Sequence, residues 1–243
     1  MSGIFITGAD TNVGKTIVTT GLTCFLRKLG IDCVALKPVE TGCELRNGEL
    51  FPADGNMLWR ASGKSISLDE VTPFRFSLPA APYRAAVSQD SRLKTSDLVE
   101  HIRTIEETHE IVIVEGAGGL FVPIEEKRMF VDLIKELGFP VVLVTRSKLG
   151  TINHTMLSVE ALVTRKLNIS GVILSECDET KGPEEEYTPK DIARMIFPIP
   201  FFKLPFLDRS TLDRPAEIGA LMEKQWGRDN LLKLSNSDHS IRL

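Results

Sequence analysis

Short, continuous apolar runs alternate along the chain with segments whose apolar residues recur at helical spacing. Continuous runs of this length are typical of strands buried on both faces of a parallel sheet. They predict strands at residues 4–7, 33–37, 111–115, 141–145 and 169–174, with a weaker one near 200–203. The intervening segments predict helices at residues 15–29, 96–109, 129–137 and 155–166. Ser96 would cap the second of these helices, and Gly30 and Gly138 would end the first and the third.

This alternation of strand and helix predicts a single doubly wound α/β domain, with a mostly parallel sheet and helices on both faces. Ligands of such sheets bind at the carboxyl ends of the strands, so residues that carry chemistry are expected directly after each strand. We assign residues 1–227 to this domain and residues 228–243 to a polar tail that is expected to fray. Residues 40–86 are expected to cross the ligand-binding edge of the sheet with one short helix, at about 54–62.

The composition excludes several classes of partner. The chain is 42% hydrophobic and 26% charged, which is ordinary for a globular protein, and its net charge is −4. This charge provides no field that would recruit nucleic acid or an anionic membrane. Neither a signal peptide nor an apolar run long enough for a membrane helix is recognisable. The four cysteines form no CxxC pair or metal-like cluster, so we expect buried free thiols in a cytoplasmic protein.

The most informative motif follows the first predicted strand and reads Gly8-Ala-Asp-Thr-Asn-Val-Gly14-Lys15-Thr16. A strand, a glycine turn, Gly-Lys-Thr and a helix together predict a loop whose backbone N–H groups surround phosphates. Lys15 would reach the β- and γ-phosphates, and the Thr16 hydroxyl would bind Mg²⁺. Five residues separate the two glycines where four are usual, and Ala9 takes the usual first-glycine position. A chance Gly-Lys-Thr at a helix start is the alternative, which the strand before it and the helix after it disfavour.

Two other strand ends carry charged residues. Lys37 ends the second strand and would add another cation beside a triphosphate, although a strand-end lysine can also simply extend to solvent. Glu115 follows four apolar residues, as the acid of a Walker B strand does, and precedes a glycine-rich turn that permits close approach of a ligand. Asp54 is a further candidate Mg²⁺ ligand, but its position suits a helix cap equally well.

The segment after the fourth strand offers a different site. Gly150 and Thr151 lie where a helix should start, and free N–H groups there would either hold a carboxylate or simply be capped. His154 is more typical of a structural residue than of a base. The Asn-Lys-x-Asp motif that reads guanine is not found at the expected strand ends, and no Cys/His pair suggests glutaminase activity. Position 10, where partition-type ATPases carry a second lysine, is Asp10.

Four segments together resemble dethiobiotin synthetases: residues 7–16, Lys37-Pro38-Val39, residues 114–119 with the sequence VEGAGG, and residues 148–154 with the sequence KLGTINH. The resemblance extends from the first strand to about Leu207. The loop and the VEGAGG segment also occur in relatives such as cobyrinic acid amide synthases, whereas the segment at 148–154 is more specific. The resemblance implies a P-loop NTPase-like fold.

The resemblance also implies a reaction, the ATP-dependent ureido-ring closure of biotin biosynthesis. CO₂ adds to one amine of 7,8-diaminononanoate, and an oxygen of the resulting carbamate attacks the γ-phosphate of ATP. The second amine then closes the carbamic–phosphoric anhydride to give dethiobiotin and phosphate, with ADP as the other product. The family is a homodimer whose site lies near the subunit interface, so the implied partners are a second copy of the chain and small molecules, with ATP and Mg²⁺ as cofactors.

Roles follow from the matched positions. Lys15 and Lys37 would neutralise the reacting carbamate and γ-phosphate, and Thr16, Asp54 and Glu115 would hold Mg²⁺. The implied nucleotide-binding residues are Asn12, Val13, Gly14, Lys15, Thr16, Ile17, Asp54, Glu115, Gly116, Ala117, Gly118, Ser175, Glu176, Leu204, Pro205 and Phe206. The implied substrate residues are Thr11, Thr41 and Gly118, together with Leu149, Gly150, Asn153 and Tyr187 from the partner subunit.

Two positions depart from the family pattern. Ser175-Glu176 stands where members often carry Asn-Asp to read adenine, so the base preference is left open and other triphosphates are candidates. Asn12 stands where an acid is common. Two alternative functions remain: the ATPase part of a cobyrinic acid amide synthase, which would need a glutaminase domain, and a partition-type NTP switch, which Asp10 disfavours.

Overall fold

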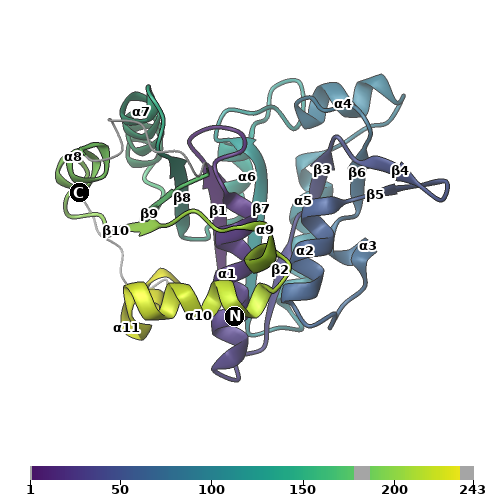
Figure 1. The fold of residues 1–243 in the computed structure, drawn as a ribbon. Helices are drawn as coiled ribbons and strands as arrows, with labels where there is room; N and C mark the ends of the chain where they lie inside the picture. Colours follow the sequence, from purple (N-terminus) through teal and green to yellow (C-terminus); the bar gives the residue numbers. More distant parts are fainter. Residues whose placement is uncertain (1, 178–186, 236–243) are drawn as a thin grey trace.

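The computed structural model describes residues 2–177 and 187–235, and a six-stranded parallel sheet forms its centre (Figure 1). Its strands lie in the order β10-β9-β8-β1-β7-β2. Their bounds are β1 (Ser2–Gly8), β2 (Cys33–Leu36), β7 (Ile111–Gly119), β8 (Val141–Arg146), β9 (Ile169–Ser175) and β10 (Phe201–Leu204). Every pair of neighbours in this sheet is parallel, so the predicted fold class is confirmed.

Helices cover both faces of the sheet, and alternate strand residues serve the two faces. Ile4 and Ile6 of β1 belong to one apolar cluster, whereas Phe5 between them belongs to the other. The first cluster contains residues of α1 (Lys15–Lys28), α2 (Ala53–Ala61), α10 (Pro215–Trp226) and α11 (Arg228–Ser235). The second contains residues of α5 (Thr95–Glu106), α6 (Phe130–Leu137), α7 (Thr151–Thr164) and α8 (Thr188–Met195). This two-sided burial explains why the strands are apolar throughout.

Two helix starts differ from the sequence prediction. Helix α5 begins at Thr95, with Lys94 in the capping position, so Ser96 is not its cap. The backbone N–H of Thr95 donates instead to the carboxylate of Glu125, at 2.5 Å, from a loop that is distant in sequence. Helix α7 begins at Thr151, after Gly150 with φ of 90°, which confirms the helix start expected at Gly150 and Thr151 and adds residues 151–154 to the helix that the apolar pattern predicted.

Residues 40–86 contain more regular structure than the single helix predicted for them. Short strands β3 (Val39–Thr41) and β6 (Phe74–Phe76) pair in parallel, and β4 (Glu44–Arg46) and β5 (Glu49–Phe51) form a hairpin. Helices α3 (Leu68–Val71) and α4 (Pro82–Ser88) accompany α2. A strand of three residues is too short to show an alternating apolar pattern. Strands β3 and β6 are stabilised by pairing with each other, and they are distant along the chain, so no local pattern in the sequence predicts them.

The end of the described chain is ordered where fraying was expected. Helix α11 follows the short helix α9 (Arg209–Leu212) and α10, and contacts β1 and β9. Its Leu231 and Leu234 are fully buried. The expectation of fraying from Arg228 is therefore wrong for residues 228–235, because two apolar side chains anchor the helix. Residues 236–243 lie outside the described part, and the predicted domain boundary at residue 227 stays a prediction.

The cysteines form no disulfide bond among the described residues. All four cysteines are free thiols, and Cys33 and Cys43 are buried. Burial raises the pKa of Cys43 to about 11, which keeps this thiol protonated. None of the described helices combines the length and the apolar character needed to cross a membrane.

Candidate functional site

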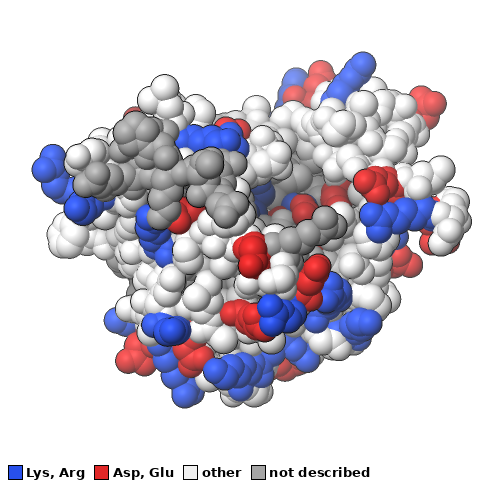
Figure 2. All heavy atoms as spheres, in the orientation of Figure 1, with Lys and Arg blue, Asp and Glu red and all other residues white. Residues whose placement is uncertain are grey.

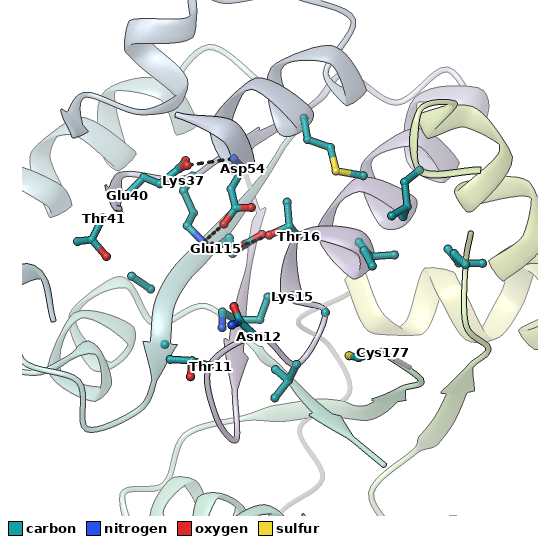
Figure 3. Close-up of a pocket in the computed structure, with 18 of the residues that line it drawn as sticks. Thr11, Asn12, Lys15, Thr16, Lys37, Glu40, Thr41, Asp54, Glu115 and Cys177 are labelled. Carbon is teal, nitrogen blue, oxygen red and sulfur yellow. Dashed lines mark hydrogen bonds and ion pairs between the residues drawn. The ribbon is translucent and has the colours of Figure 1, made fainter. Parts of the chain in front are cut away.

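The strand order places three sequence-distant segments at one edge of the sheet. Strand β1 lies beside β7, which lies beside β2, and all three are parallel. The phosphate loop after β1, Glu115 in β7 and Lys37 after β2 are therefore neighbours in space. Together with α2 they line a cavity of about 470 Å³. Figure 2 shows the hollow, with both signs of charge at its wall, and Figure 3 shows its side chains.

The phosphate loop has a backbone that requires its glycine. Gly14 has a φ of 89° and directly precedes the first residue of α1, Lys15. A Cβ atom at Gly14 would also lie only 2.5 Å from the Ser175 hydroxyl oxygen. Both the backbone conformation and this close contact therefore exclude a side chain at position 14. Asn12 also has a positive φ, of 53°, which asparagine tolerates. The N-terminus of α1 therefore faces the cavity with its N–H groups available for an anion.

A compact charged cluster occupies the centre of the cavity (Figure 3). The Lys37 ammonium lies 2.5 Å from a carboxylate oxygen of Glu115 and 3.1 Å from one of Asp54. The Thr16 hydroxyl donates to the same Glu115 oxygen at 2.9 Å, and the Thr19 hydroxyl donates to the other at 2.9 Å. Glu115 is fully buried and Lys37 nearly so. The alternative in which Lys37 extends to solvent is thus wrong.

Burial and mutual attraction shift the pKa values of this cluster in opposite directions. Burial acts to lower the pKa of Lys37, but the charges of Glu115 and Asp54 outweigh it, and the pKa lies above the usual lysine value. The charge of Lys37 lowers the pKa of Asp54. Burial and, next, the charge of Lys37 lower the pKa of Lys15 to about 8. Within residues 2–177 and 187–235, no ion pair joins Lys15 to a carboxylate of the kind that keeps Lys37 charged, so the Lys15 ammonium is suited to an anionic ligand.

The donor set suits a hard divalent cation. A threonine hydroxyl and two carboxylates meet around Lys37, and oxygen ligands of this kind, completed by phosphates and water, are those that Mg²⁺ takes. Within residues 2–177 and 187–235, no group of three histidines, cysteines or carboxylates forms a metal site of protein ligands alone. Thr16, Asp54 and Glu115 therefore fit a cation that is shared with a bound phosphate.

Asp54 is not the cap of α2. The capping position belongs to Pro52, which makes no side-chain capping bond. The carboxylate of Glu40 accepts the N–H groups of Asp54, at 3.0 Å, and Gly55, at 2.8 Å. Burial and, next, the charge of Asp54 raise the pKa of Glu40 to about 7. Sequence reasoning missed Glu40, although an acid three residues after Lys37 was the available signal.

Most of the predicted site residues share this cavity. The lining residues among them are Thr11, Asn12, Val13, Gly14, Lys15, Thr16, Ile17, Lys37, Thr41, Asp54, Glu115, Ala117, Gly118, Glu176 and Phe206. The predicted residues outside the lining are Gly116, Ser175, Leu204, Pro205, Leu149, Gly150, Asn153 and Tyr187. The lining residues that were missed are Glu40, Met57, Cys177, Leu207 and Leu212. Apart from Glu40, these belong to no motif. The roles of the predicted residues stay predictions.

One end of the cavity is apolar. Phe206, Leu207 and Leu212 line the part that follows β10, the edge strand opposite β2. Figure 3 shows Cys177 and Thr41 on opposite sides of Lys15. Glu176 is buried there and pairs with Lys203 of β10 at 2.5 Å. A flat apolar ligand group suits this end, which lies on the other side of Lys15 from Thr41.

The start of α7 forms a separate feature. Leu149 is 94% exposed. The hydroxyl group of Thr145 hydrogen-bonds to those of Thr151, at 2.7 Å, and Thr155, at 2.9 Å. A carboxylate oxygen of Asp10 lies 3.8 Å from His154 Nδ1 and 3.7 Å from the Arg146 guanidinium. Asp10 thus links the phosphate loop to α7, and His154 takes part in this structural contact.

Comparison with solved structures identifies the fold. The structure of pNOB8 ParA bound to nonspecific DNA superposes with a TM-score of 0.59 at 11% identity, over 96% of this chain and 97% of that one. The cell-division protein MinD of Aquifex aeolicus gives a TM-score of 0.55 at 15% identity, over 96% and 95%. At this identity, the likeness shows the fold alone.

Sequence comparison identifies the family. Residues 2–206 match a family described as an AAA domain. The chain is 40% identical to the ATP-dependent dethiobiotin synthetase BioD of Anaeromyxobacter sp. (strain Fw109-5), over 84% of this chain and 90% of that one. It is 38% identical to the protein of the same name from Thermodesulfovibrio yellowstonii, over 89% and 93%. The chain belongs to the ATP-dependent dethiobiotin synthetase family.

Proposed function

We propose that this protein catalyses the ATP-dependent closure of a ureido ring on 7,8-diaminononanoate, which forms dethiobiotin in biotin biosynthesis. The observation that carries the proposal is the placement of two nearly buried lysines, Lys15 and Lys37, in one cavity with Asp54 and Glu115. The names of the curated relatives support the product and the use of ATP.

The chemistry asks for positioning and positive charge rather than for a strong base. CO₂ converts one amine of the substrate to a carbamate, whose oxygen attacks the γ-phosphorus of ATP and displaces ADP. The second amine attacks the carbamate carbon and phosphate leaves, which closes the ring. Since the carbamate is already nucleophilic, orientation and electrostatic stabilisation suffice to accelerate the transfer.

The residues of the cavity divide this work. Lys15 would hold the β- and γ-phosphates, and Lys37 would neutralise charge that develops between the carbamate and the γ-phosphate. Thr16, Asp54 and Glu115 would hold Mg²⁺, which would supply further positive charge to the phosphate oxygens when bound. Thr11, Thr41 and Gly118 would line the diamine. Thr41 lies on the other side of Lys15 from Cys177, which supports separate places for diamine and base (Figure 3).

The base would lie at the apolar end. Phe206 lines this end of the cavity, whereas Leu204, Pro205 and Ser175 would support it from outside the lining. Ser175 packs on Gly14, and Glu176 is paired with Lys203. The base preference stays open, since Ser175 has no amide that could read adenine.

We also propose a homodimer, in the cytoplasm, whose site is completed by the partner subunit. Leu149, Gly150 and Asn153 lie outside the main cavity, and Leu149 is almost fully exposed. These residues, with Tyr187, would hold the carboxylate tail of a diamine bound in the other subunit. The N–H of Thr151 already donates to the Lys148 carbonyl oxygen at 3.0 Å, so the carboxylate would be attracted by the positive end of the α7 dipole.

Mixing the protein with ATP, Mg²⁺, bicarbonate and diaminononanoate tests the proposed reaction. We expect phosphate release that requires both the diamine and bicarbonate, with dethiobiotin detected by mass spectrometry. The control omits the diamine. Equal phosphate release with and without the diamine would reject this function in favour of a simple NTPase.

Lys37→Ala should separate binding from turnover. Loss of one cation that acts on the transition state typically lowers kcat by about 10²–10³-fold, while ATP bound through the phosphate loop should be retained. Steady-state kinetics and calorimetric ATP titration measure the two quantities. Lys28→Ala, which removes an exposed lysine paired with Glu223, is the matched control. Wild-type kcat in Lys37→Ala would make this lysine structural.

ATP affinity of the free protein should decline with increasing pH above pH 8. With its pKa lowered to about 8, Lys15 is charged below that pH and must take up a proton on binding above it. The affinity should therefore fall by up to about tenfold per pH unit above 8 and change little between pH 6 and 7.5. Calorimetry in two buffers of different ionisation enthalpy measures the uptake directly. No proton uptake at pH 9 would contradict this assignment.

Complementation between inactive variants tests the shared site. Asn153→Ala should weaken diamine binding and leave ATP binding intact. In a mixture with Lys37→Ala, each heterodimer would contain one site with both native residues, so about a quarter of wild-type activity should return. Each variant alone provides the baseline. A mixture no more active than the average of its components would show that Asn153 does not act across an interface.

A further inference from the structure

Glu40 is a buried acid with both carboxylate oxygens engaged by backbone. One oxygen accepts the N–H of Asp54 at 3.0 Å, and the other accepts the N–H of Gly55 at 2.8 Å. Only 6% of the residue is exposed. Figure 3 shows Glu40 beside Lys37, reaching the backbone of Asp54. None of the catalytic steps described above uses this carboxylate.

Helix α2 needs an acceptor of this kind. The first N–H groups of a helix have no partner within the helix, and Pro52 in the capping position supplies none through its side chain. The carboxylate of Glu40, in β3, accepts two of these N–H groups instead, and its negative charge is favourable at the positive end of the helix dipole. The backbone of Gly55 also packs closely against Thr72, since a Cβ atom at Gly55 would lie 2.0 Å from the Thr72 hydroxyl oxygen. The start of α2 is therefore fixed on two sides.

The position of Asp54 depends on this anchor. Its side chain is 46% exposed, so packing alone does not hold it. Its carboxylate contacts Lys37, and its backbone is held by Glu40. Lys37 and Glu40 lie three residues apart, and Glu40 is fixed in β3 by pairing with Arg75 of β6. One short segment thus holds Asp54 by both its side chain and its backbone.

We propose that Glu40 is a positioning residue that orients Asp54 toward the bound cation and Lys37. This inference rests on the proposed function, in which Asp54 holds Mg²⁺ beside ATP. The role is geometric, because both carboxylate oxygens already bond to backbone N–H groups. Residues that orient metal ligands in this way typically change metal affinity or activity by about 10–100-fold when replaced.

Three variants separate geometry from charge. Glu40→Ala removes both acceptors, and Glu40→Asp keeps the charge but is one methylene too short to reach the helix. Glu40→Gln keeps the length and one acceptor oxygen. Glu70→Ala is the matched control, because the Glu70 side chain also caps a helix start, accepting the N–H of Ser67 at 2.7 Å on α3.

The measurement is the affinity for ATP by calorimetry, with Mg²⁺ and with EDTA, alongside thermal melting. We expect Glu40→Ala and Glu40→Asp to lose about 10–100-fold in Mg²⁺-dependent affinity, with affinity in EDTA unchanged. Glu40→Gln should lose less than either. Glu70→Ala should melt at a lower temperature and keep the full effect of Mg²⁺. If Glu40→Ala does not melt cooperatively, the comparison of the Gln and Asp variants decides.

Two results would overturn the inference. A wild-type Mg²⁺ effect in Glu40→Ala, or in Glu40→Asp if the Ala variant does not fold, would show that Asp54 needs no anchor. A Glu40→Asp variant that behaves as wild type while Glu40→Gln fails would show that charge is what matters. Failure of the proposed function is distinguishable, since wild-type protein would then bind Mg²⁺ and ATP without diamine-dependent phosphate release.

Discussion

The site depends on one buried ammonium held between two carboxylates. Lys37 lies 2.5 Å from Glu115 and 3.1 Å from Asp54, and Glu115 has no exposure to solvent. Ions buried in this way are expensive to desolvate and are tolerated only when they are paired and hydrogen-bonded. The Thr16 and Thr19 hydroxyl groups complete the bonding of Glu115. The protein's own contacts therefore hold these charges in place, and fixed charges are what electrostatic stabilisation of a phosphoryl transfer requires.

The topology makes this cluster possible. Strand β1 lies between β8 and β7, and β2 lies beyond β7, so the ends of β1, β7 and β2 follow one another along the sheet edge. The cell-division protein MinD and the DNA-bound pNOB8 ParA share this fold at 11–15% identity, so the fold alone does not set the reaction. The contribution of this chain lies in what surrounds the phosphate loop: Lys37, the threonines Thr11 and Thr41, and α2 with its anchor Glu40.

Sequence reasoning was accurate where a local pattern carried the signal. Each predicted strand of the main sheet is present, because continuous apolar runs identify strands buried on both faces. It failed where the deciding contact came from elsewhere in the chain. Glu125 caps α5 from a distant loop, Glu40 caps α2 from β3, and two buried leucines anchor α11 in a segment that looks polar. None of these partners is adjacent in sequence, so no local pattern could reveal them.

The sequence by itself determined the fold class, the phosphate loop and the family, because each is recorded in the spacing of a few residues along one stretch of chain. The tertiary structure alone decided that Lys37 is buried rather than solvated, that Asp54 faces it rather than capping α2, and that Glu176 pairs with Lys203. These outcomes depend on charges and N–H groups brought together from distant segments. These interactions gain their energy only once the sheet has formed, because Coulomb attraction and desolvation depend on the distance between the charged groups and on their burial.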